Sequence, residues 1–256
     1  MKKNHPLQRP GIEPWTPTQL RLHKEAVRRL ETILSLAVAR VSLKKNITEE
    51  QLYKFIVDRM MRSSIASMSG WAIVAYGPSA AEPHYEFPRG KSRKIKPGHF
   101  LLIDIWGKLN RPDAPYADIT HMYFVGKNPS SYFQTLWNDL RDARDCALAL
   151  IQKNSHARGD ALHGCASDHL DHCNYKGLFI HGLGHDLGHD HVHGPGANLS
   201  PKFSRALIAG RGYTIEPGIY KKGKFGVRSE MDFFFDANRR VQVTTRLQNQ
   251  LECISA

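Results

Sequence analysis

The chain lacks a long apolar run, and nowhere approaches the roughly 18 consecutive apolar residues that a membrane-spanning helix needs. Its first residues lead straight into Pro6 and Pro10 without the apolar segment of a secretory signal. We therefore expect a cytoplasmic protein with no membrane contact. The 256 residues, 41% of them hydrophobic, suffice for a well-buried core. We expect one catalytic domain over 1–256 with an N-terminal extension at 1–15 and no separate N-terminal domain.

Cysteine is scarce, and the spacing of the four cysteines suggests neither a disulfide framework nor a zinc site. The four residues, Cys146, Cys165, Cys173 and Cys253, have neither zinc-finger nor CxxC spacing. Free thiols in a reducing cytosol fit this pattern better than disulfides do. We expect four free cysteines without a chemical role.

Acidic residues are outnumbered, with 24 Asp and Glu against 36 Lys and Arg and a net charge of +12. Such an excess can mark a nucleic-acid-binding protein. The densest basic stretches, 91–96 and 221–224, contain no interleaved aromatic residues on which bases could stack. We therefore expect solvated basic loops and no nucleic-acid partner.

Helix and strand signals are interspersed along the chain, without repeats or low-complexity linkers. Two capping boxes, TPTQ at 16–19 and TEEQ at 48–51, each predict the start of an amphipathic helix. A third helix is predicted after Pro129. Between them, the Gly, Pro and Ala-rich segment 77–88 predicts a loop, and FLLIDIW at 100–106 reads as the best strand. This order of elements predicts an α+β or α/β fold.

Carboxylates lie in segments that should be apolar strands. Asp104 falls inside FLLIDIW, Asp118 just before an apolar run, Glu216 inside GYTIEPGIY and Glu230 inside FGVRSEMDFFF. Buried carboxylates are costly and repel one another unless a cation lies between them, so four together predict a metal site. Oxygen-rich ligation with one imidazole suits Mn, Co, Fe(II) or Zn.

These segments resemble the motifs of the pita-bread metallopeptidases, the family of methionine aminopeptidase, aminopeptidase P and prolidase. The resemblance spans roughly Leu20 to Leu251, and DIWGKL, PYADIT and HGPGAN bring it closer to the Xaa-Pro aminopeptidase and prolidase branch. The matching segments are PHYEF at 83–87, LLIDIWGK at 101–108, YADIT at 116–120, FIHGLGHDLG at 179–188, TIEPGIY at 214–220 and VRSEM at 227–231.

The resemblance implies a pita-bread α+β fold, with curved antiparallel sheets related by a pseudo-two-fold axis and helices on the outer face. It also implies a dinuclear metal-dependent exopeptidase that hydrolyses a bond near the N-terminus of a peptide substrate with a metal-bridging hydroxide. The cofactor would be two divalent cations, manganese, cobalt, zinc or Fe(II). A homodimer stays open.

Metal ligands follow from motif position within this resemblance. Asp104 would chelate one metal, and His185 and Glu216 the other. Asp118 and Glu230 would bridge both. Glu216 would also carry a proton to the leaving amine.

Further residues would act beside the metals. His84, His181 and His193 match the family's non-ligand histidines, which donate hydrogen bonds to the substrate carbonyl and the intermediate. Arg228 would orient a bridging carboxylate or a neighbouring acid.

One extra residue separates the histidines of the last motif. The family's spacing of seven residues after His185 falls on Val192, which cannot donate a hydrogen bond. Either His191 or His193 must take the role, and the intact HGPGAN segment at 193–198 favours His193. Both would lie on one face of an extended segment.

Three functions stay open at this point. The first is an exopeptidase with a preference for Xaa-Pro bonds. Because relatives usually carry an N-terminal domain and only a short stretch precedes the first helix here, we expect peptides longer than dipeptides to be accepted. The second is a creatinase-like hydrolase of a non-peptide C–N bond. The third is a non-catalytic relative that uses the fold and the basic surface to bind RNA or protein, although such relatives lose ligands and this chain retains all five. The histidine-rich tract 181–193 could also be an adventitious metal-binding loop.

Overall fold

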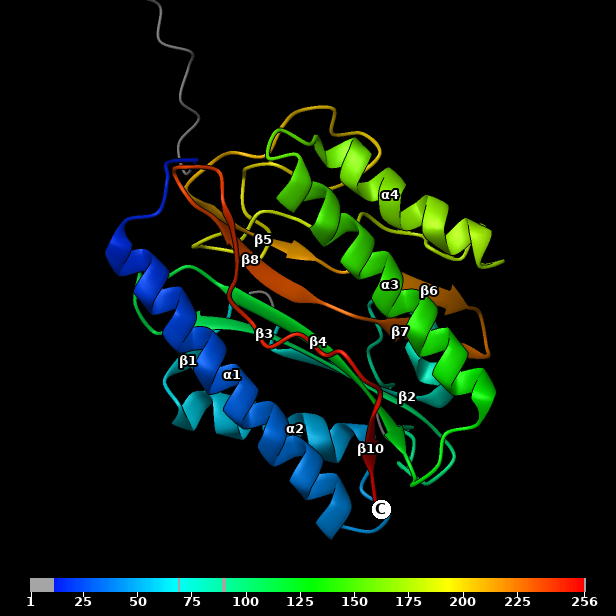
Figure 1. Ribbon diagram of the computed structural model, residues 1–256. Coiled ribbons are helices and arrows are strands. Elements are labelled where there is room, and N and C mark those ends of the chain that lie inside the picture. Colours follow the sequence, from blue (N-terminus) through cyan, green and yellow to red (C-terminus); the bar gives the residue numbers. More distant parts are fainter. Residues whose placement is uncertain (1–11, 69, 89–90, 256) are drawn as a thin grey trace, which may run out of the picture.

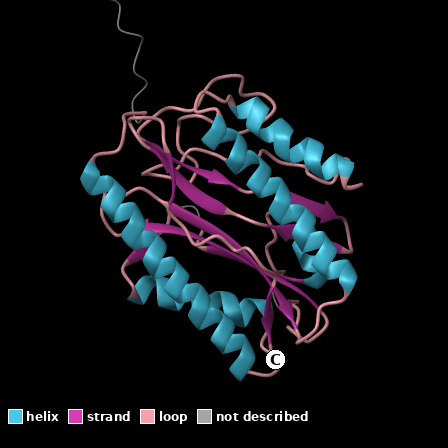
Figure 2. Ribbon diagram, viewed as in Figure 1, coloured by secondary structure: helices cyan, strands magenta, loops and turns pink. Residues whose placement is uncertain are grey.

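Two pairs of helices flank the strands of the structure, a computed structural model that describes residues 12–68, 70–88 and 91–255 (Figure 1 and Figure 2). Helix α1 (Pro17–Leu43) packs with α2 (Glu49–Arg62), and α3 (Ser131–Lys153) packs with α4 (Gly159–His172). The mixture of helices and mostly antiparallel strands confirms the α+β class.

Strand β3 (His99–Leu109) lies at the centre of the larger sheet. It pairs antiparallel with β1, β2 and β4, while β10 joins the far edge of β4 in parallel. A second sheet has the order β5-β8-β9, and β6 pairs with β7. The remaining bounds are β1 Ile65–Ala66, β2 Ala72–Tyr76, β4 Ala117–Val125, β5 Arg211–Ile215, β6 Gly218–Lys221, β7 Phe225–Arg228, β8 Met231–Phe235, β9 Val241–Val243 and β10 Glu252–Ile254.

Local signals in the sequence placed the first three helices correctly. Thr16 accepts from the amide of Gln19 at 3.2 Å, and the Gln19 side chain accepts from the Thr16 amide at 2.8 Å, which confirms the first capping box. Thr48 and Gln51 repeat the arrangement at the start of α2. Helix α3 begins at Ser131, after the predicted proline. The segment predicted as a loop at 77–88 contains the short 3-10 helix Gly77–Ala81.

Each helix pair packs in its own hydrophobic cluster. Alternate residues of β3 pack with α1 and α2, and the others pack with α3 and α4. Of the predicted extension at 1–15, residues 1–11 lie outside the described residues. Trp15 is buried, stacks on Phe234 at a centroid distance of 5.8 Å and donates its amide to the Gly210 carbonyl at 2.6 Å. None of the helices in the described ranges combines the length and apolar composition needed to cross a bilayer.

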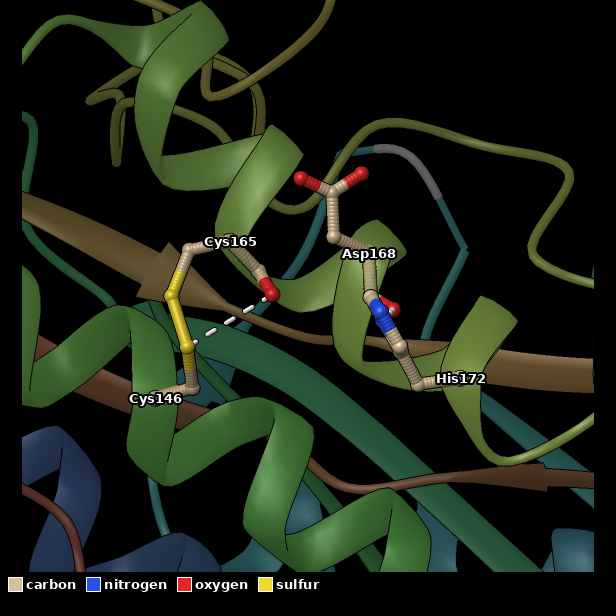
Figure 3. The surroundings of a disulfide bond; sticks show 4 residues. All are labelled: Cys146, Cys165, Asp168 and His172. Atoms are coloured by element: carbon tan, nitrogen blue, oxygen red, sulfur yellow. Dashed lines mark hydrogen bonds between the residues drawn. A yellow bond between two sulfur atoms is a disulfide. The ribbon is translucent and has the colours of Figure 1, made fainter.

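Cysteine pairing departs from the prediction. Cys146 of α3 and Cys165 of α4 form a disulfide (Figure 3), so the expectation of four free cysteines is wrong for these two, while Cys173 and Cys253 are free. Their Cα atoms lie 6.3 Å apart because the packed helices bring them face to face. Sequence spacing could not show this, since α4 was not predicted. The thiol argument for a reducing cytosol therefore no longer holds.

Candidate metal centre

The acidic residues of the two central strands point to one side of the larger sheet. On β3, Leu101, Ile103 and Ile105 pack in the cluster formed with α1 and α2. Side chains alternate along a strand, so Asp104 points to the opposite face. On β4, Ala117 and Ile119 pack in the α1–α2 cluster. Asp118 lies between them and therefore points to the same face of the sheet as Asp104.

Three more predicted ligands come from the second half of the chain. The amide of His185 donates to Thr214 Oγ1 at 3.0 Å, which fixes the His185 segment beside β5. Glu216 follows the end of β5, and Glu230 directly precedes β8. The amide of Glu230 donates to the Thr120 carbonyl at 3.3 Å, which ties the start of β8 to β4. The two sheets therefore meet where these side chains lie.

All five predicted ligands line one cavity of about 350 Å³. Ligand atoms of Asp118, His185 and Glu230 all lie within 4.8 Å of one another. His185 Nε2 lies 3.5 Å from Asp118 Oδ2 and 3.4 Å from Glu216 Oε1. Asp104 completes the wall of this cavity. The structure thus brings together every residue that the motifs singled out as a ligand.

The donor atoms in this cavity fit a cation. Asp104 Oδ1, Asp118 Oδ1 and Glu230 Oε1 are buried and accept no hydrogen bond from any residue that the structure describes. Buried carboxylate oxygens without a partner are costly, so each calls for a positive charge. His185 Nδ1 lies 3.0 Å from the Asp186 carbonyl and must donate to it, which leaves the Nε2 lone pair facing the carboxylates. Oxygen donors with one imidazole match a divalent metal.

Electrostatic repulsion leads to the same conclusion. Burial raises the pKa of Asp118 and of Glu230 well above the usual range, and the negative charges of neighbouring carboxylates raise both further. Burial also raises the pKa of Glu216 to about 7 and lowers the pKa of His185 to about 4. Without a cation this cluster would take up protons, whereas bound divalent metal would keep the carboxylates ionised.

The stability of the protein after a chelator has removed its metal should depend on pH through the protonation of Glu216. Burial raises the pKa of Glu216 to about 7 in the folded chain, against 4.5 for a free glutamate side chain. Such a carboxyl contributes stability that is fully present below the unfolded-state pKa and lost as pH rises through the folded-state pKa. We expect the free energy of unfolding of the wild type, relative to Glu216→Gln, to fall by roughly 3 kcal/mol between pH 4.5 and pH 7.5.

Urea titrations of both proteins in chelator measure this difference. The comparison with Glu216→Gln matters because the histidines of the site, whose pKa values burial lowers, give the opposite slope in both proteins. A difference in stability that stays constant across this pH range would contradict the assigned burial of Glu216.

Arg228 joins two of the carboxylates. Its Nη2 donates to Asp104 Oδ2, and its Nε donates to Thr120 Oγ1 at 3.0 Å. The Thr120 hydroxyl in turn donates to Glu230 Oε2 at 2.7 Å. Arg228 therefore occupies a position from which it can orient Asp104 directly and Glu230 through one hydroxyl.

His181 is engaged within the protein on both sides of its ring. Nδ1 lies 2.8 Å from the Gly182 carbonyl and must donate to it, so Nε2 accepts from the Tyr220 hydroxyl at 2.9 Å. Arg228 Nη1 donates to the same hydroxyl at 3.2 Å. In this arrangement His181 has no N–H left for a substrate. Sequence reasoning had no reason to single out Tyr220, whose partners come from separate motifs.

His84 and His193 remain open to the cavity. His193 lies with its ring centroid 4.0 Å from that of His185, and partial burial and this neighbour lower its pKa to about 4. His191 and Val192 also line the cavity, although most of Val192 is buried with Trp15, so the lining does not decide between His191 and His193. At neutral pH His193 is thus a neutral imidazole that can donate one N–H.

Three buried charged residues, Asp186, Arg211 and Lys108, hold the segment that carries these histidines. Asp186 forms a two-bonded pair with Arg211 at 2.8 and 2.7 Å and accepts from the Gly196 amide at 2.8 Å. Lys108, 8% exposed, donates to the His189 carbonyl at 2.5 Å. Sequence reasoning missed all of them. The sequence did offer one signal, the position of Lys108 two residues after Trp106 in a predicted strand. Its partner, the carbonyl of His189, is 81 residues away in the sequence.

Lys108→Met should loosen the histidine segment without changing the metal site. The change removes the donor to the His189 carbonyl, a charged hydrogen bond worth roughly 1.5–3 kcal/mol. The amides of Gly188 and Gly194 donate to the Val192 and Asp186 carbonyls at 3.1 and 2.7 Å, and these bonds close a hairpin at 186–194. We expect hydrogen exchange at these two amides to accelerate by about tenfold or more. Metal content should stay the same. Lys54→Met, which removes an exposed lysine, is the control. Unchanged exchange in Lys108→Met would show that the hairpin does not depend on this contact.

Comparison with known proteins gives consistent matches. The sequence pattern of metallopeptidase family M24 matches residues 21–236. A putative Xaa-Pro aminopeptidase of Mycoplasma pneumoniae is 28% identical over 189 residues, 73% of this chain and 51% of the relative. An uncharacterised peptidase of Staphylococcus aureus is 30% identical over 207 residues, 80% of this chain and 55% of the relative. The chain thus spans about half the length of the curated relatives it matches.

Solved structures confirm the pita-bread fold. An X-Pro aminopeptidase from Thermotoga maritima superposes with a TM-score of 0.83 at 24% identity, over 95% of this chain and 65% of that one. A prolidase from Thermococcus sibiricus gives a TM-score of 0.80 at 26% identity, over 94% and 62%. The fold expected from the motifs is therefore the one observed.

Proposed function

The chain belongs to metallopeptidase family M24, and from this membership we propose that it is a dinuclear metal-dependent exopeptidase of the Xaa-Pro aminopeptidase or prolidase kind. The observation that carries the proposal is the convergence of three buried, unpartnered carboxylate oxygens with the free lone pair of His185 in one cavity. A merely structural cluster of acids would have been paired with bases or hydroxyls.

The proposed ligands are the five cavity residues predicted from the motifs. Asp104 and the pair His185 and Glu216 would each hold one cation, while Asp118 and Glu230 would contact both. When bound, two divalent cations supply a nucleophile from water near neutral pH and stabilise negative charge on the substrate carbonyl.

The chain's own groups would complete the reaction. Glu216 faces the cavity and would take a proton from the attacking water and pass it to the leaving amine. His193 and His84 would donate hydrogen bonds to the substrate carbonyl. Arg228 would hold Asp104 in place, with Tyr220 and His181 supporting the guanidinium.

An amino-acid release assay tests this function. Xaa-Pro peptides, Met-Xaa peptides and non-peptide amides would be incubated with protein loaded separately with Mn(II), Co(II) or Zn(II), and again after chelation. We expect metal-dependent release of an N-terminal residue from Xaa-Pro peptides. Release only from a non-peptide substrate would favour the creatinase-like alternative, and no chelator-sensitive release from any substrate would contradict an enzymatic role.

A further inference from the structure

Exposed lysines from three segments gather at one end of the molecule. The amide of Ile95 donates to the Ile47 carbonyl at 2.8 Å, which joins the segment 93–98 to the turn after α1. The amide of Gly98 donates to the Val125 carbonyl at 2.7 Å, which joins the same segment to the end of β4. Helix α1 also contacts β10, the parallel neighbour of β4 (Figure 1). We define the basic edge as the exposed lysines of these segments, Lys44, Lys45, Lys94, Lys96 and Lys127.

Nearby acids do not balance the charge of the basic edge. The segments 43–48, 93–98 and 126–130 contain no aspartate or glutamate. None of the five lysines forms an ion pair with any residue that the structure describes. Lys54 and Arg62 of α2, in contrast, each pair with an acid four residues earlier. The basic edge therefore presents uncompensated positive charge, which attracts an anionic surface.

An exposed leucine at the same place favours lipid over nucleic acid as the partner. Leu43, the last residue of α1, is 84% exposed and directly precedes Lys44 and Lys45. The three segments contain no aromatic residue on which a base could stack. An apolar side chain among lysines suits the boundary between lipid headgroups and acyl chains, because the leucine can enter the apolar layer while the ammonium groups stay beside the phosphates.

We propose that the basic edge docks the protein on the surface of an anionic membrane, with Leu43 entering the interface. Each lysine close to such a surface strengthens binding by roughly fivefold. This docking differs from the expectation of no membrane contact, which rested on the lack of a spanning segment. The lysines of the basic edge are not among the residues that line the metal cavity, so the docking does not depend on the proposed exopeptidase function.

Sedimentation with lipid vesicles tests the docking on the whole chain. Vesicles of phosphatidylglycerol mixed equally with phosphatidylcholine should bind the protein about tenfold or more tightly than vesicles of phosphatidylcholine alone. Raising the salt from about 50 to about 200 mM should weaken this binding by about tenfold, because salt screens exposed charges. Lys44→Glu combined with Lys45→Glu should weaken it by about tenfold or more. Lys221→Glu combined with Lys222→Glu makes the same change in net charge at another exposed stretch and is the matched control.

The control should keep the affinity of the wild type to within about threefold, and Leu43→Ser should weaken binding to the mixed vesicles by about threefold or more. Equal binding to the two kinds of vesicle, or equal losses in the two double variants, would overturn the proposal. Tighter binding of a single-stranded RNA that displaces the vesicles would assign the basic edge to nucleic acid instead. Both double variants should release amino acids from peptides at the rate of the wild type, so a failure of the exopeptidase assay leaves the vesicle result standing.

Discussion

Asp118→Ala and Glu230→Ala should each lower kcat/KM by about 10³-fold or more and reduce the bound metal from two ions to one or none. Both carboxylates face the centre of the cavity with an unpartnered buried oxygen, and both are proposed to contact two cations. Loss of either would leave each cation with fewer ligands and would remove charge that balances it. Metal analysis after gel filtration and the peptide assay measure the two effects.

Stability measurements separate this effect from misfolding. Asp118→Asn keeps the shape of the side chain but removes a carboxylate that is repelled by neighbouring carboxylates. After metal is removed with a chelator, the variant should therefore be at least as stable as the wild type. Asp142→Ala, an exposed change on α3, is the control for loss of a carboxylate. Unchanged metal stoichiometry and activity in the Asp118 and Glu230 variants would show that the ligand assignment is wrong.

His193→Ala should lower kcat by about 10² or more, while His191→Ala has a clearly smaller effect. His193 lies against the ring of His185 and lines both the metal cavity and an adjoining polar cavity, which Asn198 and Ser200 also line. His191 lines the metal cavity but is not among the residues that line the polar cavity. Its lowered pKa keeps His193 neutral at pH 7, so it can donate a hydrogen bond to the substrate carbonyl.

Metal content provides the internal control for this pair, because neither histidine is a proposed ligand and both variants should bind as much metal as the wild type. A larger loss of kcat in His191→Ala would transfer the role to that residue. Near-wild-type rates in both variants would mean that the chain works without a second substrate histidine.

Local and motif-based signals explain what could be predicted from the sequence. The capping boxes at Thr16 and Thr48 act within four residues, so the sequence alone could place the starts of α1 and α2. Acids within or directly beside apolar strand segments are equally visible, because a charged residue stands out among apolar neighbours in the sequence. These signals led to the α+β fold and to the residues that line the metal cavity.

Features that depend on distant partners were not accessible in this way. The apolar residues that helix α4 buries are few, Leu162, Ala166 and Leu170, and it also buries Gly159 and His163, so its apolar periodicity is weak. The pairing of Asp186 with Arg211 joins residues 25 positions apart, and nothing local marks either as buried. The spacing of the cysteines was uninformative for the same reason.

The link between α3 and α4 has a consequence for a cleaved chain. Cys146 and Cys165 lie on either side of the turn at 154–158, which joins the two helices. A protease that cut this turn would leave two polypeptides held covalently by their sulfur atoms. Such a nicked molecule would migrate as one species on a denaturing gel and separate into two fragments only after a reductant is added.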